Sequence, residues 1–302
     1  MSEEKRAVGI AQYVGMGLFI TLTAVIALML ATPFEATDIK AFHNPASIWN
    51  PIYFFIFITG FTALILIVLR FGAKRLINLF MLAAVAVTLY YVMDGLLLYL
   101  HASIAIPLFG YGLNVDVGAL IITLILSLLL YKYPEWYVIN ATGLIIAGGA
   151  AAIFGISLIP ELVVLLMIIL AVYDATSVYK TKHMVSLAES VIDLRIPILF
   201  VLPRKRNFST LNRQGLELGG GDAFFMGLGD AIIPTMLVVS AYRYVSVVPA
   251  LGALAGTLVG YSALTRLSGK GNPHAGLPFL NTGSIIGFLI GRFLIGLLLT
   301  NI

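Results

Sequence analysis

Of the 302 residues, 60% are hydrophobic and only 11% are charged, and the mean hydropathy is +1.03. Soluble domains carry about twice that charged fraction, so lipid rather than water must solvate most of this surface. The basic residues lie in short segments between apolar runs, so we assign the net charge of +4 to membrane topology and expect no nucleic-acid partner. The chain has no cysteine, which excludes disulfides, thiol catalysis and thiolate metal sites.

The apolar runs predict nine transmembrane helices, because a helix needs roughly 20 apolar residues to cross the hydrocarbon core. The first run is too long for the core of a signal peptide, so we expect it to be retained as a span. The predicted fold class is therefore an all-α polytopic membrane protein. We expect the spans at residues 8–31, 51–69, 76–100, 113–131, 138–157, 160–180, 222–241, 246–265 and 278–300.

The positions of the charges test this count. If the N-terminus is cytoplasmic, the inner segments hold nearly all lysines and arginines, and the outer segments hold only Lys40 and Arg243. The positive-inside rule requires this asymmetry, whereas an even number of spans would place basic segments on both faces. We therefore predict a multi-pass protein of the cell membrane with nine spans and a cytoplasmic N-terminus, in contact with the lipid bilayer.

The predicted spans divide the chain into three parts. The middle part is a long, basic, cytoplasmic loop. Apolar residues at helical spacing over 184–191 predict a short helix on the membrane surface. The apolar segment 196–203, which ends in proline, predicts a strand. The parts are residues 1–180 with six spans, the loop 181–221, and residues 222–302 with three spans.

Two acidic residues lie at matched depth in the predicted membrane region. Asp174 precedes Lys180, at the inner end of the sixth span, by six residues, or about 9 Å of helix. Asp230 follows the predicted start of the seventh span by eight residues, or about 12 Å. Because consecutive spans are antiparallel, both carboxyls reach a similar level. Asp94 and Glu161 fall near the outer surface, where we expect interfacial roles.

Two neighbouring carboxyls in a site of low dielectric can act together as an acid–base pair. Both cannot be ionised together, so the pair holds one proton. One carboxyl can then act as a general base for a bound water, and the other as a general acid for the amide. Amide hydrolysis by this route uses neither a metal ion nor a cofactor, and we expect none. The proton belongs to the pair, and we do not assign it to either residue.

Three neighbours support a constructed site around the acids. Gly227 and Gly229 precede Asp230, and their missing side chains allow another backbone to approach closely. Tyr173 directly precedes Asp174 and can orient a carboxyl or line a cleft, or can simply pack.

The start of the ninth span is a further candidate. It reads Leu277, Pro278, Phe279 and Leu280, at the cytoplasmic level of the two acids. Proline at a helix start is common without any function. A non-helical backbone here would instead offer N–H and C=O groups to an extended substrate.

Together these motifs resemble the GxGD aspartyl proteases of the presenilin and signal peptide peptidase type. That family carries Tyr-Asp in the sixth span, Gly-x-Gly-Asp in the seventh and Pro-Ala-Leu before the ninth. The resemblance covers all nine spans in order, and the short chain resembles an archaeal presenilin homologue. It implies a presenilin-like fold, catalytic roles for the two aspartates, a substrate-contacting role for the Pro278 segment, and transmembrane helices of other proteins as substrates. The corresponding residues are Val172-Tyr173-Asp174, Gly227-Leu228-Gly229-Asp230 and Pro278-Phe279-Leu280, with Phe279 in place of alanine.

Other functions fit the residues less well. The four histidines lie in loops or at span edges, which excludes a His-Glu-x-x-His zinc site and a serine–histidine dyad in the membrane. A proton- or ion-coupled transporter or channel could use Asp174 and Asp230 as a relay. It would predict internal repeats or broken helices, and neither is clear. The sequence leaves open the substrate, self-cleavage in the 181–221 loop and assembly into a homo-oligomer.

Overall fold

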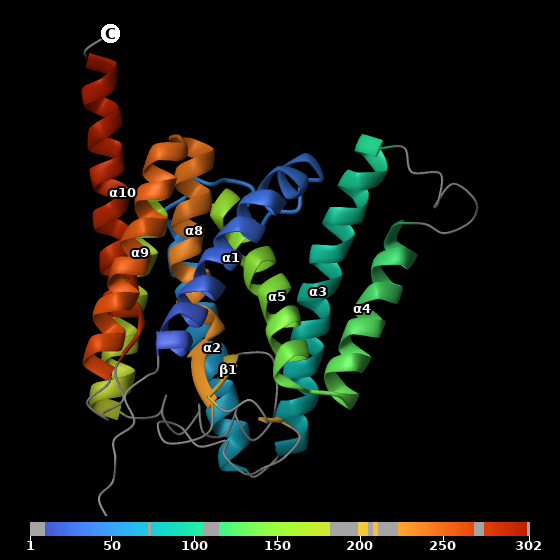
Figure 1. The fold of residues 1–302 in the computed structure, drawn as a ribbon. Helices are drawn as coiled ribbons and strands as arrows, with labels where there is room; N and C mark the ends of the chain where they lie inside the picture. The colour runs from blue at the N-terminus through green and yellow to red at the C-terminus, as the bar shows by residue number, and fades with distance from the viewer. Residues whose placement is uncertain are drawn as a thin grey trace, which may run out of the picture.

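A computed structural model describes residues 10–71, 74–104, 115–181, 199–204, 208–210, 223–268 and 275–300. These residues form nine α-helices and one two-stranded sheet (Figure 1). A π-helical turn, Ser177–Thr181, extends α6. The helices are α1 (Ile10–Ala36), α2 (Trp49–Arg70), α3 (Lys74–Ile104), α4 (Val115–Lys132), α5 (Trp136–Ile156), α6 (Pro160–Thr176), α8 (Leu228–Tyr244), α9 (Val247–Ser268) and α10 (Leu277–Thr300), and the strands are β1 (Leu199–Pro203) and β2 (Ala223–Gly227).

The helices confirm a multi-pass membrane protein. Eight of the described helices are long and apolar enough to cross a membrane. The remaining one, α8, has 17 residues and follows directly on β2. The all-helical membrane-spanning architecture is therefore as predicted, whereas the count of nine spans and the cytoplasmic N-terminus stay predictions.

The start of the seventh helix differs from the prediction. Residues 223–227 form strand β2, which pairs antiparallel with β1, and α8 begins at Leu228 rather than near Asp222. A short apolar strand joined to an apolar helix has no break in hydropathy, so composition alone could not separate them. As a result Asp230 lies in the first turn of α8 and not about 12 Å along a helix.

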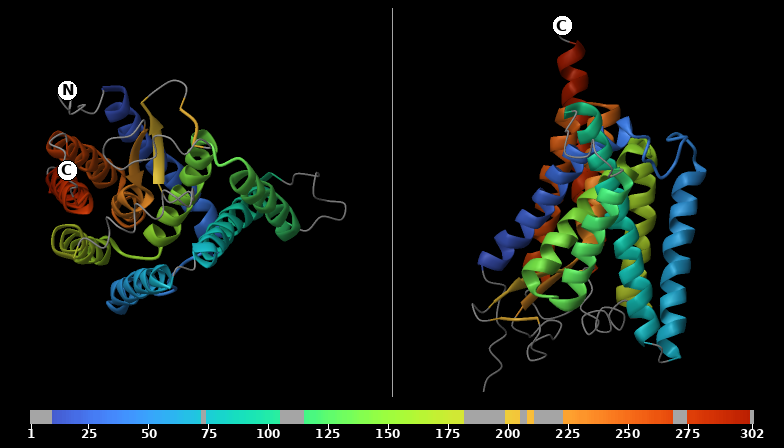
Figure 2. Two further views of the ribbon diagram at one scale, coloured as in Figure 1. Left: turned by 90° about the horizontal axis from the view of Figure 1, so that it is seen from below. Right: turned by 90° about the vertical axis from the view of Figure 1, so that its right-hand side faces the viewer.

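The two strands lie at one end of the helix bundle (Figure 2). Strand β1 confirms the part of the predicted 196–203 strand that the structure describes. Residues 196–198 and the predicted interfacial helix at 184–191 lie outside the described residues.

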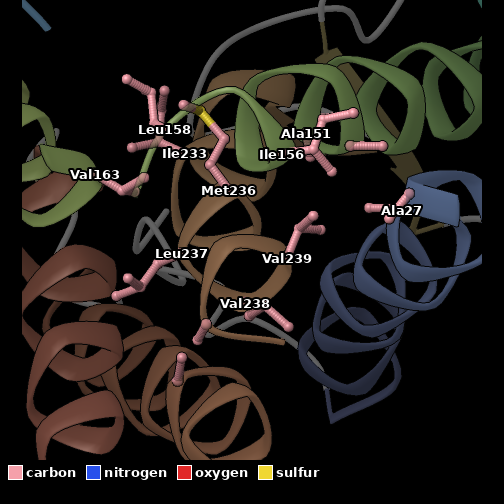
Figure 3. Close-up of a cluster of buried hydrophobic side chains, with 14 of the residues drawn as sticks. Ala27, Ala151, Ile156, Leu158, Val163, Ile233, Met236, Leu237, Val238 and Val239 are labelled. Atoms are coloured by element: carbon pink, nitrogen blue, oxygen red, sulfur yellow. The ribbon is translucent and has the colours of Figure 1, made fainter. Parts of the chain in front are cut away.

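Helix α8 is the central element of the bundle. It contacts α1, α5, α6, α9 and α10, and most of its side chains are buried. Figure 3 shows how apolar side chains of α8 fill the space between its neighbours. Because α8 is enclosed, the residues in its first turn are held inside the bundle. The labelled members of this core are Ala27, Ala151, Ile156, Leu158, Val163, Ile233, Met236, Leu237, Val238 and Val239.

Helices α9 and α10 touch backbone to backbone. A Cβ added to Gly256 would lie 2.0 Å from the carbonyl oxygen of Gly283, and one added to Gly252 would lie 2.3 Å from that of Gly287. Closer to the start of α10, a Cβ on Gly260 would lie 2.2 Å from the carbonyl oxygen of Phe279. Small residues permit such close approach of membrane helices. The first turn of α10 is thereby fixed against α9.

Candidate active site

Asp174 lies two residues before the end of α6 and is 8% exposed. Its Oδ2 accepts a hydrogen bond from the backbone N–H of Leu277, the first residue of α10, at 3.1 Å. The first N–H groups of a helix lack partners within the helix, and the helix dipole favours an anion there. The carboxyl of Asp174 therefore caps a helix that lies far away in the sequence.

Asp230 approaches the same segment from α8. A Cβ added to Gly276 would lie 2.9 Å from Oδ1 and 3.1 Å from Oδ2 of Asp230, so this carboxyl occupies the space beside Gly276 that a side chain would need. The carboxyls of Asp174 and Asp230 also lie close enough to interact electrostatically. Gly276 and Leu277 are consecutive, so α6, α8 and the start of α10 converge on one point. The structure brings the two predicted acids together.

The two glycines before Asp230 have different surroundings. Gly227 ends β2 and precedes α8, and a Cβ there would meet the Asp230 carboxyl at 3.4 Å. A Cβ on Gly229 would meet nothing within 4 Å among the described residues. Gly227 lies beside the acid that follows it, and Gly229 leaves space next to that acid among the described residues. The close approach of another backbone at these glycines stays a prediction.

Tyr173 lies on the side of α6 that faces α2. Its ring meets Phe55 edge to face, with the centroids 5.8 Å apart. This position fixes the flank of α6 beside Asp174, and it agrees with the packing role that the sequence left open.

Residues 277–280 are helical, which corrects the expectation of a non-helical stretch. They form the first turn of α10, where Pro278 takes the second position. The N–H groups of Phe279 and Leu280 both donate to the carbonyl of Gly276 at 3.2 Å. The fixed φ of proline suits the first turn of a helix, which explains the helical start. Within this segment, the backbone N–H of Leu277 donates the hydrogen bond to Asp174.

Two residues of the site were missed from the sequence. Gly276 supports Asp230, and the Oη of Tyr179 accepts a hydrogen bond from the N–H of Ala275 at 3.4 Å. Tyr179 lies in the π-helical turn after Asp174, so the end of α6 contacts residues 275–277 twice. A glycine directly before Leu-Pro at a span start was a usable signal for Gly276. Nothing in the sequence distinguishes Tyr179 from the other tyrosines.

Two further polar contacts join α6 to α10. The side-chain amide of Asn281, which is buried, donates to the carbonyl of Met167 at 2.9 Å. At the other end of α6, Arg292 forms an ion pair with Glu161 at 2.6 Å. Glu161 therefore has a partner of its own and lies apart from the two aspartates.

Comparison with known proteins places the chain in a family. The family model described as signal-peptide peptidase, presenilin aspartyl protease matches residues 16–297. Two structures of a presenilin family intramembrane aspartate protease are similar to this one. The structure in space group C222 is 37% identical and covers 93% of this chain and 99% of its own, with a TM-score of 0.68. The structure in space group P2 is 38% identical and covers 93% and 97%, with a TM-score of 0.67.

A comparison with curated protein sequences gives no match. The family match spans nearly the whole chain and includes both aspartates, Tyr173, Gly227, Gly229 and residues 277–280. The chain therefore belongs to the signal peptide peptidase and presenilin family of aspartyl proteases.

Proposed function

We propose that this protein is an intramembrane endopeptidase of the GxGD type that hydrolyses peptide bonds within transmembrane helices of other membrane proteins. The observation that carries the proposal is the meeting of two carboxyls, from Asp174 and Asp230, on the consecutive residues Gly276 and Leu277. Membership of an aspartyl protease family supports it. We place the N-terminus in the cytoplasm and count α8 as the seventh of nine spans.

The chemistry follows from a pair that holds one proton. The carboxylate takes a proton from water, and the water oxygen forms a bond to the carbonyl carbon of the peptide. The carboxylic acid gives its proton to the carbonyl oxygen. Collapse of the tetrahedral intermediate breaks the C–N bond. The nitrogen takes a proton from the dyad, one hydroxyl group of the intermediate returns a proton to the dyad, and an acid and an amine leave. The N–H of Leu277 holds the Asp174 carboxyl in place throughout.

The substrate must be unwound before water can attack. A peptide group inside a helix has its carbonyl paired, and an opened helix in lipid leaves backbone groups that cost several kcal/mol each unless they find partners. The β1–β2 sheet lies next to the dyad, because β2 runs without a break into the helix turn that carries Asp230. We propose that an extended substrate adds to this sheet as a further strand. Main-chain bonds would then hold it largely independently of its side chains.

A proton- or ion-coupled transporter remains the alternative from another class. It would use the same aspartates as a relay. Family membership speaks against it, and a protease predicts a chemical product that a relay does not.

The test is cleavage by purified protein of a labelled transmembrane helix in detergent micelles and in liposomes. Wild-type protein should release two fragments, whereas Asp174→Asn and Asp230→Asn should release none and still elute as folded protein. Either variant removes one half of the acid–base pair. Cleavage at an undiminished rate by either purified variant would contradict the dyad.

A further inference from the structure

Asn140 of α5 completes the outer edge of strand β1. It is 3% exposed, and its side-chain amide makes two hydrogen bonds to the backbone of Val201. The Nδ2 donates to the Val201 carbonyl at 2.7 Å, and the Val201 N–H donates to Oδ1 at 2.8 Å. A neighbouring antiparallel strand would make the same pair of bonds to one residue. A helix side chain therefore takes the place of a third strand.

These two bonds determine which backbone groups point out of the sheet. In a strand, the N–H and C=O of one residue point to the same side, and alternate residues point to opposite sides. Both groups of Val201 point to Asn140, and therefore away from β2. Val201 lies opposite Phe225, so this is a pair without mutual hydrogen bonds, and the backbone groups of Phe225 point away from β1. Val201 therefore presents its backbone N–H and C=O at the outer edge of β1, and Phe225 presents its own at the outer edge of β2.

The two edges have different surroundings. Strand β1 packs against α1 and α5, and the carbonyl of its last residue, Pro203, accepts a hydrogen bond from the side chain of Gln12 at 3.2 Å. Strand β2 packs against β1 and the start of α8. By the same alternation the backbone groups of Gly227 point to the outer edge of β2, and a Cβ added to Gly227 would lie 3.4 Å from Oδ2 of Asp230. The outer edge of β2 therefore leads to the dyad.

We propose that Asn140 is a positioning residue for proteolysis. It closes the β1 edge against strand addition and holds the sheet at one height on α5, so that a substrate strand adds to the β2 edge in one register with Asp230. An unpaired strand edge accepts any extended chain, and a slip of register would bring a different peptide bond to the acids. The inference rests on the proposed function, because it concerns how that activity selects its bond.

The first test compares Asn140→Leu with a matched control, Thr142→Val. Thr142 lies on the same helix and is 1% exposed, but among the described residues its hydroxyl bonds to the carbonyls of Val138 and Ile139 in its own helix and not to the sheet. Cut positions would be mapped by mass spectrometry, and kcat and KM measured with one transmembrane substrate. Asn140→Leu should raise KM about tenfold, the equivalent of roughly one net hydrogen bond. It should also spread the cuts over neighbouring peptide bonds, with kcat within about twofold. Thr142→Val should keep the wild-type cut positions.

Val201→Pro tests the same contact from the other side. Proline removes the N–H that points to Asn140 and leaves the bonds between β1 and β2, which come from alternate residues. It should reproduce the spread of cuts, and the double variant with Asn140→Leu should add little, because both changes break one interaction. Asn140→Asp, which keeps the acceptor and loses the donor, provides a third variant if the leucine variant does not fold.

Binding is measured separately from cleavage. In the Asp230→Asn background, Asn140→Leu should weaken the binding of a fluorescent transmembrane substrate about tenfold relative to Thr142→Val. Binding that depends on Asn140 without any cleavage by the wild-type protein would overturn the proposed function, and would support only the placement of a bound strand by Asn140. Cleavage with unchanged KM and unchanged cut positions in Asn140→Leu and Val201→Pro would overturn the inference alone. A loss of kcat in Asn140→Leu that follows its loss of thermal stability would do the same. Absence of both binding and cleavage by the wild-type protein would overturn both.

Discussion

Leu277 donates its backbone N–H to the Asp174 carboxyl at 3.1 Å, so the first residue of α10 is bound to an acid on α6. The residue before it, Gly276, supports the second acid, Asp230. One short segment therefore sets the separation of the two carboxyls. Changes in this segment are expected to affect activity more than stability.

Gly276→Ala should slow cleavage strongly. The added Cβ would lie 2.9 Å from Asp230 Oδ1, so the carboxyl has to move away from its position beside the Asp174 carboxyl. We expect kcat to fall by at least about 100-fold, since small displacements of reacting groups have effects of that size. The check is kcat and thermal stability measured together. Gly60→Ala on α2 is the matched control, because a Cβ there meets nothing within 4 Å among the described residues and lies outside the site, and it should retain most of the activity. Equal kcat values for the two variants would contradict this account of the site.

Gly260→Ala and Gly252→Ala should separate stability from activity. Both place a Cβ within 2.3 Å of a carbonyl oxygen of α10, and overpacking of this kind costs about 1–3 kcal/mol. The oxygen near Gly260 belongs to Phe279 in the first turn of α10, whereas that near Gly252 belongs to Gly287, two turns further along. The temperature of thermal unfolding should therefore fall by a similar amount in both variants. The cleavage rate per folded molecule should fall mainly in Gly260→Ala. A larger loss of rate in Gly252→Ala would show that the start of α10 is not what matters.

Thiol labelling tests the orientation in the membrane. The chain has no cysteine, so Gly229→Cys and His43→Cys each introduce a single thiol at an exposed position. A charged maleimide added from the cytoplasmic side should label Gly229→Cys, because hydrolysis needs water at the dyad and the basic segments lie on that side. His43→Cys, between α1 and α2, should be labelled from the outside. The reverse pattern would overturn the assigned topology.

Substrate sequence tests the need for unwinding. Glycine or proline placed near the cut should speed cleavage, because these residues reduce the free energy needed to open a helix by about 1 and 3 kcal/mol respectively. The same substitutions placed two turns away from the cut serve as the control. Initial cleavage rates at saturating substrate report the unwinding of the bound helix. Equal rates for all substrates would indicate that the enzyme binds an intact helix.

The parts of the fold that depend on long apolar runs were predictable from the sequence, because lipid imposes length and composition on each span. The two aspartates were predictable for a related reason, since acids in a membrane are costly and few positions hold them. Strand β2 was not, because its partner β1 is distant in the sequence and an apolar strand merges into the helix that follows. Gly276 acquires its role only when α8 brings Asp230 against it, and no local pattern records that approach. The helical form of residues 277–280 was predictable from Pro278, because the fixed φ of proline suits the first turn of a helix.

The glycine faces of α9 and α10 have a mechanical consequence. Their closest contacts are made by backbone atoms, which have no rotamers to change, so we expect the two helices to move together. The segment that joins the two acids is carried on that pair of helices. We therefore expect a substrate helix that enters the site from the lipid to displace α6 rather than α10, because α8 is enclosed by its neighbours.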